Sequence, residues 1–255
     1  MKKSFSSHTL LAAAAVVALG TVAVGANADT ISGTQTALTS ASGTAVNLTT
    51  QGGVDWIYYD GTSDTAGTFQ QKAVATPSIT KPAITTTATS GGNSKLQFNV
   101  GFPASFSWTD GASMATGSNS TGYGRLIGGG SFTFTATPDG NAQTLTVYGG
   151  GFAPKSVTAT VTDTYSLANV ATPVALTNTF TGGASAGTGG DWYDTINFQA
   201  AATDPLTVTI ASSNATVSLA GATLADAAPT PEPASLGLLG IGGAAMLLIS
   251  RRKRA

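Results

Sequence analysis

Residues 131–147, from Ser131 to Val147, read SFTFTATPDGNAQTLTV and contain the clearest structural pattern of the chain. Phe132 and Phe134 alternate with threonines, a Pro-Asp-Gly turn signal follows at 138–140, and the alternation resumes before Val147. Two short runs of period two on either side of a turn indicate antiparallel β-strands that each bury one face. The rest of the chain repeats this pattern.

Apolar side chains at every second position predict further strands around residues 46–48, 54–59, 96–102, 157–161, 196–200, 206–210 and 217–219. The turn signals between the runs lie at 110–111, 128–130, 149–151, 182–183 and 204–205. No segment between Asp29 and Ala228 has a convincing helical period of 3.6 residues. We therefore predict an all-β fold, a jelly-roll-like antiparallel β-sandwich.

Composition limits the functions that the middle of the chain can serve. Only 9% of the residues are charged, the net charge is −1, and there is no cysteine. Few basic residues lie between the two ends, so no basic stripe is available to neutralise nucleic-acid phosphates. The one histidine is His8, near the N-terminus, and the only glutamate is Glu232. A Ser-His-Asp triad, a Cys-His pair and a His-bearing zinc site are excluded, and we expect neither a cofactor nor a nucleic-acid partner.

Residues 1–28 have the organisation of a secretory signal peptide. Lys2 and Lys3 form a positive region, an apolar run follows, and small residues at Ala26 and Ala28 suit signal peptidase. We expect this enzyme to cleave after Ala28. The alternative is an uncleaved anchor helix, for which the apolar run is short.

The C-terminal end predicts a linker, a membrane-spanning helix and a basic stop. The uncharged stretch 234–250 would form a helix of roughly 25 Å, at the short end for a membrane span. The basic residues of 251–255 resist crossing and should stay cytoplasmic, which leaves the middle of the chain outside. The predicted division is a signal peptide at 1–28, a β-sandwich at 29–224, a Pro-rich linker at 225–233, a transmembrane helix at 234–250 and a tail at 251–255.

This tail resembles the PEP-CTERM sorting signal of bacteria. The resemblance rests on Pro231, Glu232 and Pro233, on the glycine-rich apolar stretch that follows, and on the terminal Arg/Lys cluster. It implies that exosortase, a membrane-embedded transpeptidase, recognises the Pro-Glu-Pro and cuts near it. We therefore expect an inner-membrane intermediate and then a cell-surface or extracellular protein of the envelope, extracellular matrix or biofilm. The alternative is an ordinary tail anchor behind a Pro-rich linker.

Two stretches of the middle, GVDW at 53–56 and FSWTDG at 106–111, precede QTLTVY at 143–148. In order and spacing they resemble a β-sandwich module of exported bacterial proteins, across most of residues 44–224. Such modules are often appended to carbohydrate-active or surface proteins, and the resemblance carries no activity over to this chain. The Asp-Trp and Trp-Thr-Asp-Gly residues belong either to core and turn or to a binding site.

Aromatic residues are the candidate ligand contacts. Trp56 and Trp108 are expected in the core, with Trp56 and Tyr58 on one face of their strand and Tyr59 on the other. Aromatic rings can also form a platform for sugars, and the residues that could supply one are Trp56, Tyr58, Tyr59, Tyr123, Trp192 and Tyr193. Among these the candidate glycan contacts are Tyr58, Tyr59, Trp192 and Tyr193.

Aspartates offer two weaker candidate sites. Asp191 and Asp194 would suit a glycosidase if they faced each other across a cleft, or they belong to a polar turn. Asp60 and Asp64 could offer oxygens to Ca²⁺, or they belong to a plain loop. We expect a non-enzymatic domain of a surface or matrix protein. The alternatives are a carbohydrate-binding module, with polysaccharide as partner, and, less favoured, an Asp-dependent glycosidase.

Overall fold

The computed structural model describes residues 28–39, 44–61, 67–86, 95–99 and 101–228. The expected signal peptide, linker, transmembrane helix and tail lie wholly or mostly outside these residues. Within them the elements are β1 (Thr30–Leu38), β2 (Ala45–Asn47), α1 (Leu48–Gln51), β3 (Asp55–Gly61), β4 (Gly67–Gln71), β5 (Ala83–Thr86), β6 (Lys95–Asn99), β7 (Ser105–Trp108), β8 (Gly117–Ser120), β9 (Tyr123–Ile127), β10 (Gly130–Ala136), β11 (Ala142–Ala153), β12 (Thr158–Ser166), β13 (Val174–Thr181), β14 (Thr188–Gln199), β15 (Leu206–Ser212) and β16 (Thr216–Asp226).

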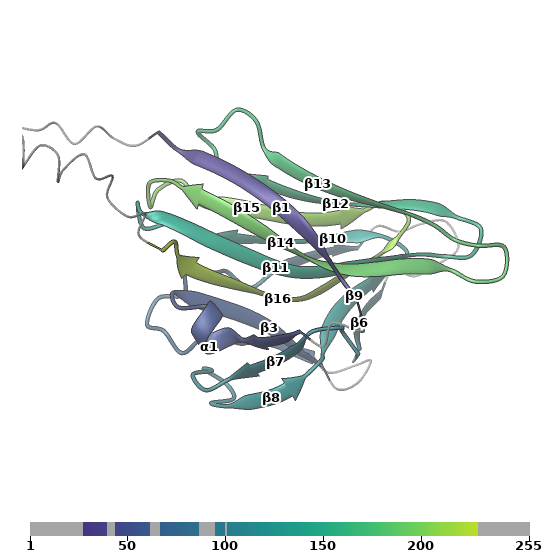
Figure 1. Cartoon of the computed structure of the whole chain (residues 1–255), viewed down its shortest axis with the longest axis horizontal. Coiled ribbons are helices and arrows are strands. Elements are labelled where there is room, and N and C mark those ends of the chain that lie inside the picture. The colour runs from purple at the N-terminus through teal and green to yellow at the C-terminus, as the bar shows by residue number, and fades with distance from the viewer. Residues whose placement is uncertain (1–27, 40–43, 62–66, 87–94, 100, 229–255) are drawn as a thin grey trace, which may run out of the picture.

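These strands form three sheets in layers (Figure 1). In the described part of the chain the central sheet has eight strands, in the order β1-β14-β11-β16-β3-β4, with β9 and β6 added beside β16. The five-stranded sheet β13-β12-β15-β10-β5 packs on one face of it, and the small sheet β2-β7-β8 covers part of the other. The predicted antiparallel β-sandwich is confirmed, and the small sheet adds a third layer.

The main core lies between the central and five-stranded sheets. β10 and β15 pair in register, with Phe132 opposite Ile210 and Phe134 opposite Val208. All four side chains are buried and pack with apolar residues of β11, β14 and β16. Burying side chains of this kind contributes about 1.5–3 kcal/mol each. The period-two pattern of the sequence therefore becomes the inner face of the sandwich.

A second core lies between the central and small sheets. Trp56 and Tyr58 of β3 point into it, whereas Ile57 and Tyr59 point into the main core. Trp56 and Trp108 are 0% and 2% exposed, with ring centroids 5.7 Å apart. The expected burial of both tryptophans and the division of the β3 aromatics between two faces are confirmed.

The expected turn at Gly149 to Gly151 is wrong, because the three glycines lie inside β11. The register of β11 on β16 shifts between Tyr148 and Gly149, as in a β-bulge. A Cβ on Gly151 would lie 2.7 Å from Val161 Cγ2 on the facing sheet. Glycine is needed here for close packing of two sheets, not for chain reversal.

Two predicted strands end earlier than expected. The strand predicted at 96–102 ends at Asn99, and Phe102 packs in the second core, away from Phe98. The strand predicted at 46–48 ends at Asn47, whose Oδ1 accepts a hydrogen bond from Thr50 N at 3.1 Å. Asn47 thereby caps α1, because asparagine favours the position before a helix.

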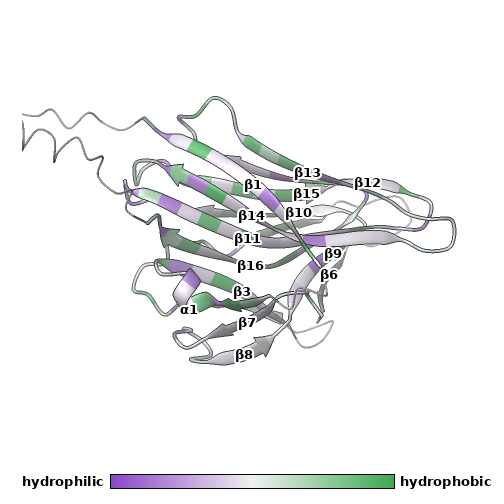
Figure 2. Ribbon diagram, viewed as in Figure 1, coloured by the Kyte–Doolittle hydropathy of each residue, from purple (hydrophilic) through white to green (hydrophobic). Residues whose placement is uncertain are grey.

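The outer face of the five-stranded sheet carries only Thr, Ser and Ala. Threonines of β12 and β13 face each other across the strands, at hydroxyl distances of 3.3 to 3.5 Å. Threonines and serines of β10 and β15 continue the array in register. Along the strands of the sheets, pale segments of intermediate hydropathy alternate with coloured ones (Figure 2). This uncharged, hydroxyl-rich surface is called the threonine face below.

Candidate functional site

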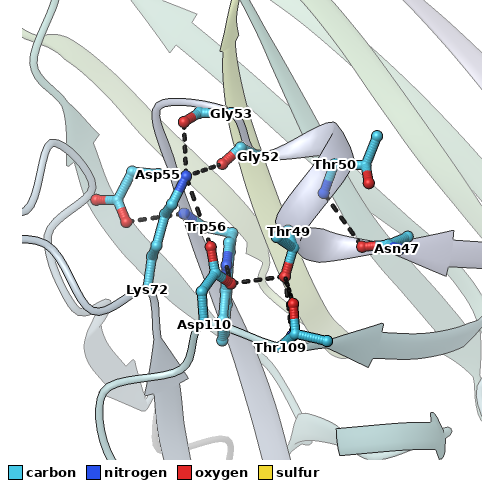
Figure 3. A network of polar contacts seen from close by, with 10 residues as sticks. All are labelled: Asn47, Thr49, Thr50, Gly52, Gly53, Asp55, Trp56, Lys72, Thr109 and Asp110. Atoms are coloured by element: carbon cyan, nitrogen blue, oxygen red, sulfur yellow. Dashed lines mark hydrogen bonds and ion pairs between the residues drawn. The ribbon is translucent and has the colours of Figure 1, made fainter. Parts of the chain in front are cut away.

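The Asp-Trp and Trp-Thr-Asp-Gly segments meet beside α1 (Figure 3). Asp110 Oδ1 accepts hydrogen bonds from Trp56 Nε1 at 3.0 Å and from Thr49 Oγ1 at 2.6 Å. Asp110 Oδ2 lies 3.7 Å from Lys72 Nζ, which also donates to two backbone carbonyls before β3, at 2.9 and 2.6 Å. The Asp110 carboxylate therefore ties together α1, β3 and the loop after β7.

Asp55, the residue before Trp56 in β3, also connects separate segments through its carboxylate. Its Oδ1 accepts from Trp56 N and its Oδ2 from Ile79 N, both at 2.8 Å. Burial raises the pKa of Asp55, and these backbone N–H groups oppose the rise. The carboxylates of Asp55 and Asp110 and the indole N–H of Trp56 all have partners inside the fold, so the two segments serve as core and turn.

A buried pair of carboxyl groups lies in the main core. Trp192 Nε1 donates to Asp163 Oδ2 at 2.6 Å, and Tyr165 Oη donates to Asp194 Oδ2 at 2.5 Å. The Oδ1 atoms of both residues are buried without a hydrogen-bond partner in the described chain. Burial, and then the neighbouring Asp194, raise the pKa of Asp163 well above its usual range. Burial also raises the pKa of Asp194.

A pocket of about 320 Å³ opens on the outer face of the central sheet, beside the small sheet. It forms where β16 changes partners: residues 217–219 pair with β9, whereas residues 221–224 pair with β3. Its polar and aromatic side chains are Tyr123 and Arg125 of β9, Phe152 of β11, Asp191 of β14, and Thr216 and Ser218 of β16. Glycines of β11 and β14 form the rest of its lining.

The glycines explain how the pocket holds a carboxylate. Gly150 lies directly across from Asp191, and a Cβ on Gly150 would overlap Asp191 Oδ1. Glycine thus lets the Asp191 carboxyl lie flat on the sheet, where burial raises its pKa to about 6. Opposite it, Arg125 donates from Nε and Nη2 to Gln97 Oε1 at 3.0 and 2.6 Å. The pocket therefore contains one oriented cation and one partly desolvated acid.

The expected pair of Asp191 and Asp194 does not form a glycosidase site. The two side chains lie on opposite faces of β14, because Asp194 points into the main core and Asp191 lines the outer pocket. The Ca²⁺ candidate falls on Asp64, outside the described residues, and on Asp60, whose side chain is also outside them. In the described ranges no three His, Cys, Asp or Glu residues form a group that could hold a metal ion.

Three of the four expected glycan contacts are wrong, because they are buried. Tyr58 and Tyr59 are 0% and 1% exposed, and Trp192 is inside the main core. Tyr193 is half-buried, with its ring centroid 6.0 Å from that of Tyr148. Two aromatic residues do reach the pocket. Tyr123 belongs to the set of aromatic residues that the sequence predicted as a possible sugar platform, whereas Phe152 was not predicted.

Two signals in the sequence could have indicated the pocket residues. Arg125 is the only arginine before the C-terminal tail. Phe152 falls on the face of β11 that otherwise carries Thr144, Thr146 and Tyr148, and it is 45% exposed. A large apolar side chain on a solvent-facing position is informative in a way that a buried one is not.

Among the residues that the structure describes, no helix has the length and apolarity to cross a membrane. No curated protein matches the chain. The family 11 carbohydrate-binding module of the cellulosomal cellulase Lic26A-Cel5E of Clostridium thermocellum is similar in structure, at 10% identity, over 68% of this chain and 96% of that module, with a TM-score of 0.21. A likeness at this score says nothing about what this chain binds.

The C-terminal end gives a specific match. The PEP-CTERM protein-sorting motif matches residues 229–254, which include Pro231, Glu232 and Pro233. The expected resemblance of the tail is thereby confirmed. This chain carries a β-sandwich followed by a PEP-CTERM sorting motif, which marks it as an exported protein sorted by exosortase.

Proposed function

We propose that the β-sandwich is a non-catalytic domain that exosortase delivers to the cell envelope or the extracellular matrix. The observation that carries the proposal is the short stretch of sequence between the folded domain and the sorting motif. The last strand, β16, ends at Asp226, and the sorting motif begins at residue 229. With so short a spacer the folded domain would stay at the membrane surface until the tail is cut.

The use of the aspartates supports a non-catalytic role. Asp55, Asp110 and Asp204 accept hydrogen bonds from groups of their own chain, and Asp163 and Asp194 are neighbours in the core. Among the described residues that line the pocket, Asp191 is the only acid. Glycoside hydrolysis by the usual route needs two carboxyl groups on either side of the bond, roughly 5 to 9.5 Å apart.

The threonine face supports a role in a crowded matrix. Its hydroxyl groups can donate and accept hydrogen bonds, and it carries no charge that would repel a neighbour. Such a surface is suited to close contact with polysaccharide chains or with other matrix proteins.

The test measures which cell fraction contains the chain, in a host that has exosortase and in the same host without it. We expect the sandwich in the matrix fraction of the first and in the membrane fraction of the second, and no release of reducing sugar ends from a panel of matrix polysaccharides. Membrane retention in both hosts would contradict the sorting route. Sugar release that Asp191→Asn abolishes would contradict the non-catalytic role.

Carbohydrate binding is the second candidate function, and the pocket is the observation that favours it. An open pocket with two aromatic rings, an acid, a guanidinium and three hydroxyl groups offers the contacts that sugar rings use. This function is compatible with the matrix role but does not depend on it.

A further inference from the structure

We infer that the pocket binds one neutral hexopyranose unit of a polysaccharide, stacked on Phe152 and held at its hydroxyl groups by Asp191 and Arg125. The inference rests on the second candidate function above and names its site and ligand. The sorting route and the matrix role stand independently of it.

The Phe152 ring is a built platform. A Cβ on Gly189 would lie 3.0 Å from Phe152 Cδ2, and a Cβ on Gly187 would overlap the tip of the ring. The ring therefore rests on bare backbone of the neighbouring glycine-rich segment, and 45% of the residue stays exposed. A flat ring supported from behind suits the apolar face of a sugar, since both surfaces are flat and leave water together.

Asp191 supplies an acceptor that the fold does not use. In the described part of the chain no hydrogen bond reaches its carboxylate, although the group is half-buried. A carboxylate has two oxygens that can accept from two adjacent hydroxyl groups, and such charge-assisted bonds are the stronger kind. An ion pair or a backbone N–H would have satisfied a purely structural aspartate, as they do at Asp110 and Asp55.

Arg125 supplies the donor, and its geometry is fixed in advance. Gln97 Oε1 accepts from Nε and Nη2 of Arg125, which orients the guanidinium and leaves further N–H groups for a ligand. Tyr123, Thr216 and Ser218 add hydroxyl groups around the rim. Pre-orientation of this kind lowers the entropy lost on binding.

Size and charge select the ligand class. A volume of about 320 Å³ is at the low end for small-molecule sites, so the pocket accommodates a single ring unit rather than a long chain segment. One acid and one guanidinium leave the pocket without net charge. In so small a pocket a uronic acid could pair its carboxylate with Arg125 only by also bringing it near Asp191, and an amino sugar could pair its ammonium with Asp191 only by also bringing it near Arg125. A neutral hexose is therefore preferred.

Binding should depend on pH through Asp191. The groups that face it are Tyr123 and Arg125 of β9, Thr216 and Ser218 of β16, and Phe152 of β11, with Tyr193 on its own strand. The pKa of Asp191 is about 6, so at pH 5 roughly a tenth of the carboxyl groups remain ionised. Affinity should therefore fall about tenfold between pH 7.5 and pH 5.

The experiment uses the full chain, purified in a detergent without a sugar headgroup, and three hexasaccharide probes measured by calorimetry. The probes are a glucose hexamer, a galacturonic acid hexamer and a glucosamine hexamer. We expect the glucose hexamer to bind most tightly at pH 7.5 and to weaken about tenfold at pH 5. Asp191→Asn should bind weakly at both values, and Phe152→Ala should lose at least tenfold in affinity.

The matched control is Met114→Ala, because Met114 is the other large apolar side chain that is 45% exposed in the described part of the chain, and it is outside the pocket. This variant should bind like the wild type, and circular dichroism should show all variants folded. Tighter binding of either charged hexamer, equal loss in Met114→Ala and Phe152→Ala, or no binding of any probe would overturn the inference. In that event intact sorting to the matrix would still support the proposed function.

Discussion

Replacing Asp110 by alanine should lower the free energy of unfolding by about 3 kcal/mol. Asp110 Oδ1 accepts two hydrogen bonds, from Trp56 Nε1 and Thr49 Oγ1, and hydrogen bonds to a charged group contribute about 1.5–3 kcal/mol each. Trp56 is fully buried, so its indole N–H would lose its partner without gaining water. Leaving a buried donor unsatisfied costs about 1–3 kcal/mol.

The ion pair with Lys72 adds little to this figure. The Lys72 and Asp110 side chains are 14% and 28% exposed, and their charged atoms are 3.7 Å apart. A partly exposed pair at this distance contributes about 0.5 kcal/mol. Asp110→Asn keeps an Oδ1 acceptor for both donors and loses only the charge, so it should cost about 1 kcal/mol.

The assay is urea unfolding followed by tryptophan fluorescence and by circular dichroism. A double-mutant cycle of Asp110→Ala with Trp56→Phe should give a coupling energy of about 1–2 kcal/mol, since the two residues share one hydrogen bond. The control is Asp139→Ala, because Asp139 accepts hydrogen bonds only within an exposed turn. A loss in Asp110→Ala no larger than in Asp139→Ala, or equal losses in Asp110→Ala and Asp110→Asn, would refute the reasoning.

Three further predictions concern packing, protonation and sorting. Gly221→Ala should cost about 2 kcal/mol, because its Cβ would lie 2.6 Å from Ile57 O, whereas Gly53→Ala, with no atom within 4 Å, should be neutral; thermal unfolding compares them. The raised pKa of Asp163 stabilises the fold fully below the unfolded pKa near 4, and this contribution is lost as pH rises through the folded pKa. Urea unfolding from pH 4 upward should show that decline, and Asp163→Asn should flatten it. Glu232→Ala should leave export intact and cause the uncut, membrane-bound chain to accumulate, as fractionation in a host with exosortase would show.

The strands of the main core could be predicted because each buries one face. In β10 and β15 the alternation of Phe, Val and Ile with Thr is unbroken, and the structure keeps it in register. The sequence also contains an indication of the third layer. Residues 54–59 are apolar or aromatic at nearly every position, and such a run indicates a strand buried on both faces. Both cores do contact β3, which is why Tyr58 and Tyr59 could not be ligand contacts.

The separation of Asp191 from Asp194 also follows from the sequence. Side chains three positions apart in a strand lie on opposite faces, so the two carboxyl groups could share a cleft only if a turn separated them. The partner that Asp194 does have, Asp163, is 31 positions away on another sheet. That contact depends on the order of strands and on their register, neither of which local pattern determines.

The glycine-rich segments of β11 and β14 connect the architecture to the pocket. On the inner side, Gly151 allows Val161 and Phe180 of the facing sheet to approach the backbone closely. On the outer side, Gly150 and Gly189 leave the space that Asp191 and Phe152 occupy. A segment that only had to form a sheet would be more stable with β-branched residues, since glycine weakens strands. Close packing against the five-stranded sheet accounts for glycine at residue 151. Gly150 and Gly189 face outward, and the atoms nearest their Cβ positions belong to β11 and β14 rather than to another sheet. Their effect is to lay one acid and one aromatic ring flat on the surface, which is the arrangement that a bound sugar ring requires.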